Sequence, residues 1–230
     1  SFIFLLVGCG KKSDEIVMVT EAGFAPYEFY ENGEVIGVDI EISKKIADKL
    51  GKKLVIKDVA FDSIINELNS GKADFAAAGM SIDSERSEKV DFSIEYITSN
   101  QVVVVKKDSD IKSIDDIKDK RISVQLGTVA DTYVTKNYKD AKINRLKKFL
   151  VAAEDVKNNK SDCIVMDAIP ANELVKSNPE LKVLDGILFQ DKYGMAVKKG
   201  NKELLNSINL VLEELIKDGK IDEYIIKFSE

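Results

Sequence analysis

The chain has 230 residues, of which 44% are hydrophobic and 32% are charged, an ordinary balance with enough apolar material for one large or two modest cores. Its net charge of −6 and the lack of a basic stripe among aromatic residues argue against nucleic-acid binding. The absence of histidine excludes His-dependent triads and imidazole metal ligands. Two cysteines, Cys9 and Cys163, cannot build a disulfide framework or a Cys-rich zinc site. We therefore expect no metal and no cofactor.

The beginning of the chain is an apolar run that ends at Gly8, just before Cys9, and is followed by Gly10, Lys11 and Lys12. This run is too short to span a bilayer and is typical of the end of a secretory signal peptide. Leu6-Val7-Gly8-Cys9 resembles the lipobox of bacterial lipoproteins, in which the cysteine is acylated. We predict that residues 1–15 are a signal remnant and tether, and that Cys9 anchors the protein to the extracytoplasmic face of the cell membrane. The alternative is a buried N-terminal strand with a core cysteine.

Strand-like and helix-like patterns alternate from residue 16 onward. In the first half, short apolar runs predict strands at 16–20, 54–56 and 74–78. Apolar residues at four-residue spacing predict a helix from Val38 to Leu50, ended by Gly51. A second helix carries Ile64 and Leu68, and we expect Asp62 to cap it.

The alternation continues after the apolar run 101–105. Further strands are predicted at 122–124, 141–146, 162–166 and 194–198, and helices at 128–138, 151–157, 168–176, 202–217 and 220–228. Repeated strand–helix–strand units imply an α/β fold with mostly parallel sheets flanked by helices. Binding sites in such sheets form at the carboxyl ends of the strands.

The turns at these strand ends form an ordered set of segments. They are Thr20-Glu21-Ala22-Gly23-Phe24-Ala25-Pro26-Tyr27-Glu28-Phe29, Gly37-Val38-Asp39-Ile40, Ala60-Phe61-Asp62-Ser63, Ala78-Gly79-Met80-Ser81 through Arg86, Val124-Gln125-Leu126-Gly127-Thr128 and Asp162-Cys163-Ile164-Val165-Met166-Asp167. The set resembles the polar amino-acid solute-binding proteins of ABC importers, periplasmic binding protein family 3, and within it the arginine-binding members. The resemblance implies a two-lobed type II periplasmic-binding-protein fold. Lobe 1 would comprise 16–99 and 194–230, lobe 2 would comprise 103–189, and hinge strands would lie near 99–104 and 190–196.

By this resemblance, a free amino acid would lie between the lobes. Its carboxylate would be held by Arg86, Ser81, Thr128 and the N–H of Val129, and its ammonium by Asp167 and the carbonyl of Gly79. The ligand side chain would lie among Glu21, Phe24, Phe61, Ala78, Gln125 and Met166. A planar guanidinium fork suits a carboxylate, and a helix N-terminus favours anions. The alternatives are a surface role for Arg86, a helix cap at Asp167 and core packing for the two phenylalanines.

A count of charges then favours a cationic ligand side chain. Arg86 would balance the ligand carboxylate and Asp167 its ammonium, which leaves Glu21 without a positive partner. We therefore expect arginine, followed by lysine, ornithine or histidine, and the aromatic pair would add cation–π attraction. If Glu21 instead faces solvent, a neutral polar amino acid such as glutamine or cystine is the alternative ligand.

The predicted function is therefore capture of a free amino acid for delivery to ABC permease subunits by a monomeric, membrane-anchored lipoprotein that catalyses no reaction. Three alternatives come from other classes. A dehydratase on the same fold could use Glu21 as an acid, the clamp could be the sensor domain of a receptor, or the protein could be a structural surface lipoprotein.

Overall fold

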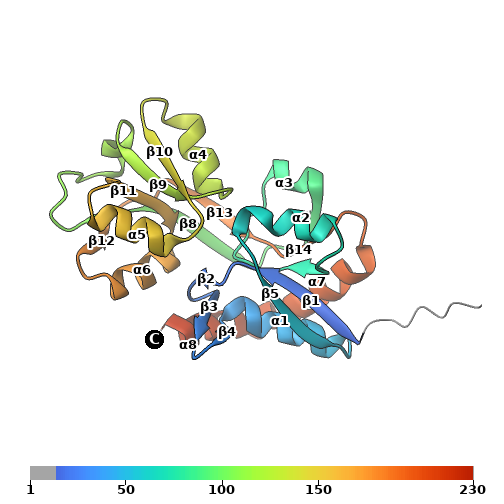
Figure 1. Cartoon of the computed structure of the whole chain (residues 1–230). Coiled ribbons are helices and arrows are strands. Elements are labelled where there is room, and N and C mark those ends of the chain that lie inside the picture. Colours follow the sequence, from blue (N-terminus) through green and yellow to red (C-terminus); the bar gives the residue numbers. More distant parts are fainter. Residues whose placement is uncertain (1–13, 230) are drawn as a thin grey trace, which may run out of the picture.

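The computed structural model describes residues 14–229, so the predicted lipobox at Cys9 lies outside the described residues. Figure 1 shows two lobes, each built on its own β-sheet with helices packed against it. None of the helices in this described part is both long enough and apolar enough to cross a membrane.

The first lobe is built on a five-stranded sheet with the order β5-β1-β6-β14-β7. Its strands are β1 (Glu15–Thr20), β5 (Lys53–Asp58), β6 (Phe75–Ala76), β7 (Val90–Phe92) and β14 (Ala196–Lys198). Its helices are α1 (Val38–Lys49), α2 (Ile64–Asn69), α3 (Ser84–Lys89), α7 (Lys202–Lys217) and α8 (Lys220–Ser229). A small antiparallel sheet that the sequence did not predict joins β2 (Gly23–Phe24), β3 (Glu28–Glu31) and β4 (Glu34–Ile36).

The second lobe is built on a six-stranded sheet with the order β10-β9-β11-β8-β12, in which β13 also pairs with β8. Its strands are β8 (Ile97–Lys106), β9 (Arg121–Gln125), β10 (Lys142–Leu146), β11 (Cys163–Asp167), β12 (Leu181–Val183) and β13 (Phe189–Tyr193). Its helices are α4 (Val129–Asn137), α5 (Phe149–Lys157) and α6 (Ala168–Ser177).

The α/β fold class is confirmed, but the sheets are more mixed than the sequence indicated. Parallel pairing joins β1 to β5 and β6, and β9 to β10 and β11. The strands β8 and β14, by contrast, pair antiparallel with their neighbours. The antiparallel pair β8–β13 links the two sheets. The lobe boundaries and hinge segments given from the sequence stay predictions.

The apolar run in β8 shows how the sequence pattern becomes packing. All four residues from Val102 to Val105 are buried. Because side chains alternate across a strand, Val102 and Val104 join one core cluster while Val103 and Val105 join another. A central strand covered on both faces therefore appears in the sequence as a continuous apolar run.

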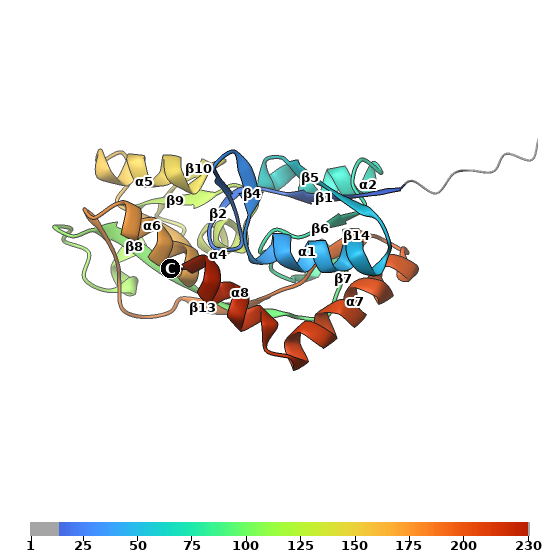
Figure 2. The same ribbon diagram turned by 90° about the horizontal axis from the view of Figure 1, so that it is seen from below.

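The C-terminal helices return to the first lobe and extend toward the second. Figure 2 shows α7 beside α1, with α8 running toward α6. The carbonyl of Ser229, at the end of α8, accepts a hydrogen bond from Lys176 on α6. The last helix therefore contacts both lobes.

The predicted capping role of Asp62 is wrong. Residues Phe61–Ser63 form a 3₁₀ turn that precedes α2, and the N-cap position belongs to Ser63, whose side chain makes no capping hydrogen bond. A tight turn of this kind satisfies the start of the helix through backbone hydrogen bonds, so no side-chain cap is required there.

Candidate ligand-binding site

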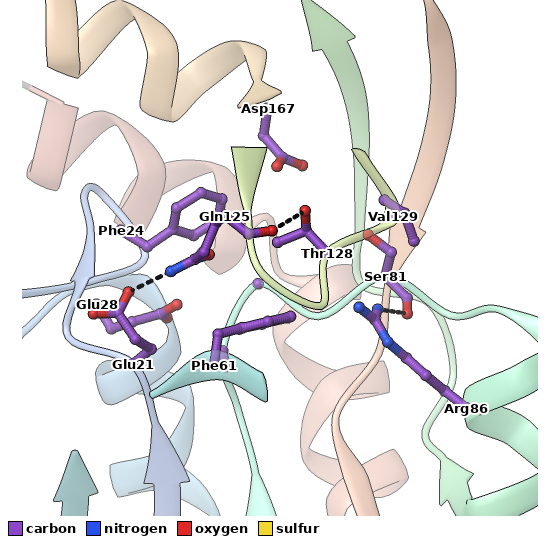
Figure 3. A pocket seen from close by; sticks show the side chains of 12 residues that line it. Glu21, Phe24, Glu28, Phe61, Ser81, Arg86, Gln125, Thr128, Val129 and Asp167 are labelled. Carbon is purple, nitrogen blue, oxygen red and sulfur yellow. Dashed lines mark hydrogen bonds between the residues drawn. The ribbon is translucent and has the colours of Figure 1, made fainter. Parts of the chain in front are cut away.

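One cavity lies where strand ends of the two lobes meet (Figure 3). The lining residues are Glu21, Phe24, Glu28, Phe61, Ala78, Gly79, Ser81, Arg86, Gln125, Thr128, Val129 and Asp167. Glu21 directly follows β1, while Gln125 and Asp167 end β9 and β11. The site therefore forms at carboxyl ends of strands, as expected for α/β sheets.

Every predicted contact residue except Met166 lines this cavity. Met166 immediately precedes Asp167 on β11, so strand alternation turns its side chain to the opposite face of the sheet. It lies in the main core and borders a separate groove instead. Met166 therefore packs in the core and does not line the cavity, in contrast to its predicted contact with the ligand side chain.

Arg86 is held in place with part of its hydrogen-bonding capacity left over. Its side chain is buried, Nη1 donates to the carbonyl of Ser81 at 2.6 Å, and Nη2 donates to the carbonyl of Gly127 at 2.8 Å. Nε lies 3.2 Å from Oδ2 of Asp83. A guanidinium has five N–H groups, of which two sit on each Nη. These contacts therefore leave one N–H on each Nη, enough for two hydrogen bonds to a carboxylate.

The hydroxyl groups of Ser81 and Thr128 are both committed within the protein. Ser81 Oγ donates to Oδ2 of Asp191, and Thr128 Oγ1 donates to the carbonyl of Gln125 at 2.8 Å. Thr128 also caps α4 by accepting from the N–H of Asp131. Because a hydroxyl has a single proton, neither group offers a further donor in this arrangement. The N–H groups of the first turn of α4, beginning at Val129, remain the anion-favouring feature on this wall.

Asp167 occupies the N-cap position of α6, but its side chain does not cap the helix. Its Oδ2 accepts from Ser99 Oγ at 2.7 Å and from the hydroxyl of Tyr193. Burial raises the pKa of Asp167, and burial followed by repulsion from Asp167 raises the pKa of Asp191 to about 6. The buried Asp167 and the partly buried Asp191 repel each other, and a ligand cation near them would relieve this repulsion.

The count of charges made from the sequence is corrected by Lys148. Glu21 is not without a partner, because Lys148 Nζ lies 3.0 Å from Glu21 Oε1. Gln125 donates to the other carboxylate oxygen at 3.1 Å (Figure 3). Burial still raises the pKa of Glu21, although Lys148 and Gln125 both act to lower it. The positive partner comes from the second lobe, which sequence reasoning did not place beside Glu21.

The aromatic residues form one wall of the cavity. Phe24 is buried and stacks on Phe149 of the second lobe with ring centroids 5.7 Å apart. Gly79 makes this packing possible, since a Cβ there would lie 2.6 Å from Phe24 Cε1 and its φ of +49° disfavours other residues. Phe61 lies under Arg86, whose Cζ is 5.4 Å from the ring centroid. Phe61 therefore also supports the guanidinium through a cation–π contact.

Glu28 lines the cavity but was missed as a site residue. It is almost fully buried, and burial followed by the proximity of Asp39 raises its pKa well above the usual range. Asp39 in turn accepts from the Gly79 N–H at 2.8 Å and from the hydroxyl of Tyr96 at 2.7 Å. Glu28 Oε2 has no hydrogen-bond partner among the described residues. Glu28 lies in the segment 20–29 that resembles the family, and this position could have identified it as a site residue.

Two further residues were missed, and only one had a usable signal. Lys148 follows the strand predicted at 141–146, so the rule that sites form after strand ends could have included it. Asp191 lies on β13, which enters the site from the strand pair that links the lobes. No sequence pattern pointed to Asp191.

Comparison with known proteins agrees with the predicted family. The model for bacterial extracellular solute-binding proteins, family 3, matches residues 16–230. The arginine-binding extracellular protein ArtP of Bacillus subtilis (strain 168) is 30% identical over an alignment that covers 96% of this chain and 91% of that protein. A mutant of ArgBP from T. maritima is similar in structure with a TM-score of 0.89 at 40% identity, covering 94% of this chain and 95% of that chain.

Structures of an ancestral arginine-binding protein, one bound to arginine and one bound to glutamine, are each 42% identical with a TM-score of 0.88. They cover 94% of this chain and 98% and 97% of their own chains. The family model and these relatives span nearly the whole described structure. This chain belongs to the bacterial extracellular solute-binding proteins of family 3.

Proposed function

We propose that this protein binds one free L-amino acid in the cavity between its lobes and delivers it to an ABC importer, with arginine or another basic amino acid preferred. The observation that carries the proposal is the presence of a buried guanidinium, Arg86, and a buried carboxyl group, Asp167, on the walls of one small cavity. Figure 3 shows the two side chains approaching it from different elements. A zwitterion needs such a pair when it leaves water.

The backbone end of the ligand can be oriented from these groups. The free N–H on each Nη of Arg86 would take the carboxylate, assisted by the first N–H groups of α4. The ammonium would lie against Asp167, with Asp191 adding negative charge behind it. In this arrangement Ser81 contributes its position and backbone rather than a hydroxyl donor, since its hydroxyl is bonded to Asp191.

The side-chain end supports a long, flat, hydrogen-bonding group. The rings of Phe24 and Phe61 and the oxygens of Glu21 and Glu28 all line this part of the cavity. A guanidinium stacks on aromatic faces and donates to several acceptors at once. The arginine-binding relatives favour the same ligand.

The remaining parts of the proposal concern the cell. The family is extracellular, and the importer partner and the lipid anchor at Cys9 are our proposals. The family match supports solute binding, in place of the dehydratase alternative.

A neutral polar ligand is the second candidate, and a specific observation favours it. Glu21 already has a cation, Lys148, so a ligand without charge would not leave this carboxylate unpaired. A relative bound to glutamine is consistent with this candidate. Isothermal titration calorimetry with arginine, lysine, citrulline and glutamine distinguishes the two, because citrulline has nearly the shape of arginine but no charge. We expect arginine to bind most tightly, and lack of binding to any of the four would refute the proposed function.

A further inference from the structure

We propose that Lys148 is a specificity-determining residue, which neutralises Glu21 from outside the cavity and thereby weakens the preference of the site for a cationic ligand side chain. This inference rests on the proposed function. In this arrangement, a residue of the second lobe that does not line the cavity sets how strongly the site prefers a charged ligand.

Lys148 and the ligand would approach Glu21 from different sides. Glu21 lines the cavity, whereas Lys148 does not and instead borders a neighbouring groove between the lobes. Gly23 also borders that groove, and a Cβ on it would lie 2.9 Å from Glu21 Oε1. The missing side chain at position 23 therefore leaves room for the Glu21 carboxylate on the side where Lys148 lies.

The Glu21 carboxylate accepts hydrogen bonds from two donors. Lys148 Nζ lies 3.0 Å from one oxygen, and Gln125 Nε2 donates to the other at 3.1 Å. A carboxylate accepts about four hydrogen bonds through its two oxygens, so room remains for a ligand donor. A cationic ligand bound there would be close to a second cation, Lys148, whereas an uncharged ligand would feel no such repulsion.

The position of Lys148 on its helix is not explained by the stability of that helix. Lys148 is the N-cap residue of α5 and makes no capping hydrogen bond. A positive charge at a helix N-terminus is opposed by the helix dipole. Its side chain is 49% exposed while that of Glu21 is 3% exposed, so the ion pair mainly compensates the charge of the buried carboxylate. The ion pair with Glu21 therefore explains a lysine at position 148 better than the stability of α5 does.

The test compares the ratio of citrulline to arginine dissociation constants, measured by calorimetry, in wild-type protein and in Lys148→Met. Removing the competing cation should raise this ratio about tenfold. Lys148→Arg keeps the charge and should restore the wild-type ratio. Lys142→Met makes the same charge change at an exposed residue of the same lobe, at the other end of β10 from the site, and should leave the ratio unchanged.

The outcomes separate the inference from the function on which it rests. An unchanged ratio in Lys148→Met, including an equal loss of affinity for both ligands, would show that Lys148 only holds the lobes together and would overturn the inference. A similar rise in the ratio for Lys142→Met would also overturn it, because the effect would then be one of general surface charge. If the wild-type protein bound neither ligand, the proposed function and the inference would both fail.

Discussion

Replacement of Arg86 by alanine is the most direct test of how the site recognises an amino acid. Arg86 would bind the carboxylate that every amino acid shares, so its loss should weaken binding of arginine, citrulline and glutamine by similar factors. Removing one partner of a buried, hydrogen-bonded charge pair costs about 2–5 kcal/mol, which corresponds to a loss of about 30-fold to about 4,000-fold in affinity. Two charge-assisted hydrogen bonds from the remaining N–H groups of Arg86 would place the value in the upper part of this range.

Calorimetry on purified protein measures this loss, and circular dichroism with thermal unfolding shows whether the variant is folded. Lys89→Ala is a matched control on the same helix, because Lys89 is half-exposed and pairs with Glu85 at 2.8 Å. It should bind all three ligands within about twofold of wild type. Arg86→Lys should give an intermediate loss, since an ammonium keeps the charge but lacks the planar fork. A folded Arg86→Ala variant that bound all three ligands within about threefold of wild type would refute the proposed role of Arg86.

Three further predictions concern the other parts of the site. Glu21→Gln should bring the affinities for arginine and citrulline to within about threefold of each other, and an undiminished preference for arginine in calorimetry would contradict a role for Glu21 in charge selection. Burial, followed by repulsion from Asp167, raises the pKa of Asp191 to about 6. Because only the ionised carboxyl group attracts the ligand ammonium, affinity should fall about tenfold as the pH is lowered from 7.5 to 5. Calorimetry in two buffers of different ionisation enthalpy should show proton release near pH 5.5, and an affinity independent of pH would exclude this coupling. Gly79→Ala should displace Phe24 and destabilise the fold by about 1–3 kcal/mol, and an unchanged melting temperature would show that the contact relaxes freely.

Much of the fold could be predicted because its signals are local. The four-residue spacing in α1 and the continuous apolar run in β8 each follow from how one element packs against its neighbours. The small sheet β2–β4 was not predicted, since its strands are two to four residues long and carry no extended alternation. The mixed sheet direction was also not predicted, because it depends on where β8 and β14 enter sheets formed by other segments.

The site residues divide in the same way. Glu21 follows β1, and Gln125 and Asp167 end β9 and β11, so the strand-end rule indicated these turns while the family resemblance assigned the roles of the residues. The partners of these residues depend on which loops of the two lobes meet. Lys148 is 127 positions from Glu21, and Asp191 is 110 positions from Ser81. Counting charges along the sequence could not include such partners.

The ionisation state of each carboxyl group is the other quantity that a list of charges omits. Glu28 is almost fully buried beside Asp39, so burial and repulsion favour its neutral form. Glu21 is also buried, which raises its pKa, but unlike Glu28 it has Lys148 and Gln125 beside it, and both act to lower that pKa. Glu28 and Glu21 line the same end of the cavity. Glu28 would therefore act as a neutral hydrogen-bonding group, whereas Glu21 would act as a negative charge that Lys148 partly neutralises. The selectivity of the site is then a property of the Glu21–Lys148 pair across two lobes, which is why the Lys148→Met ratio measurement tests it more directly than any change to the cavity lining.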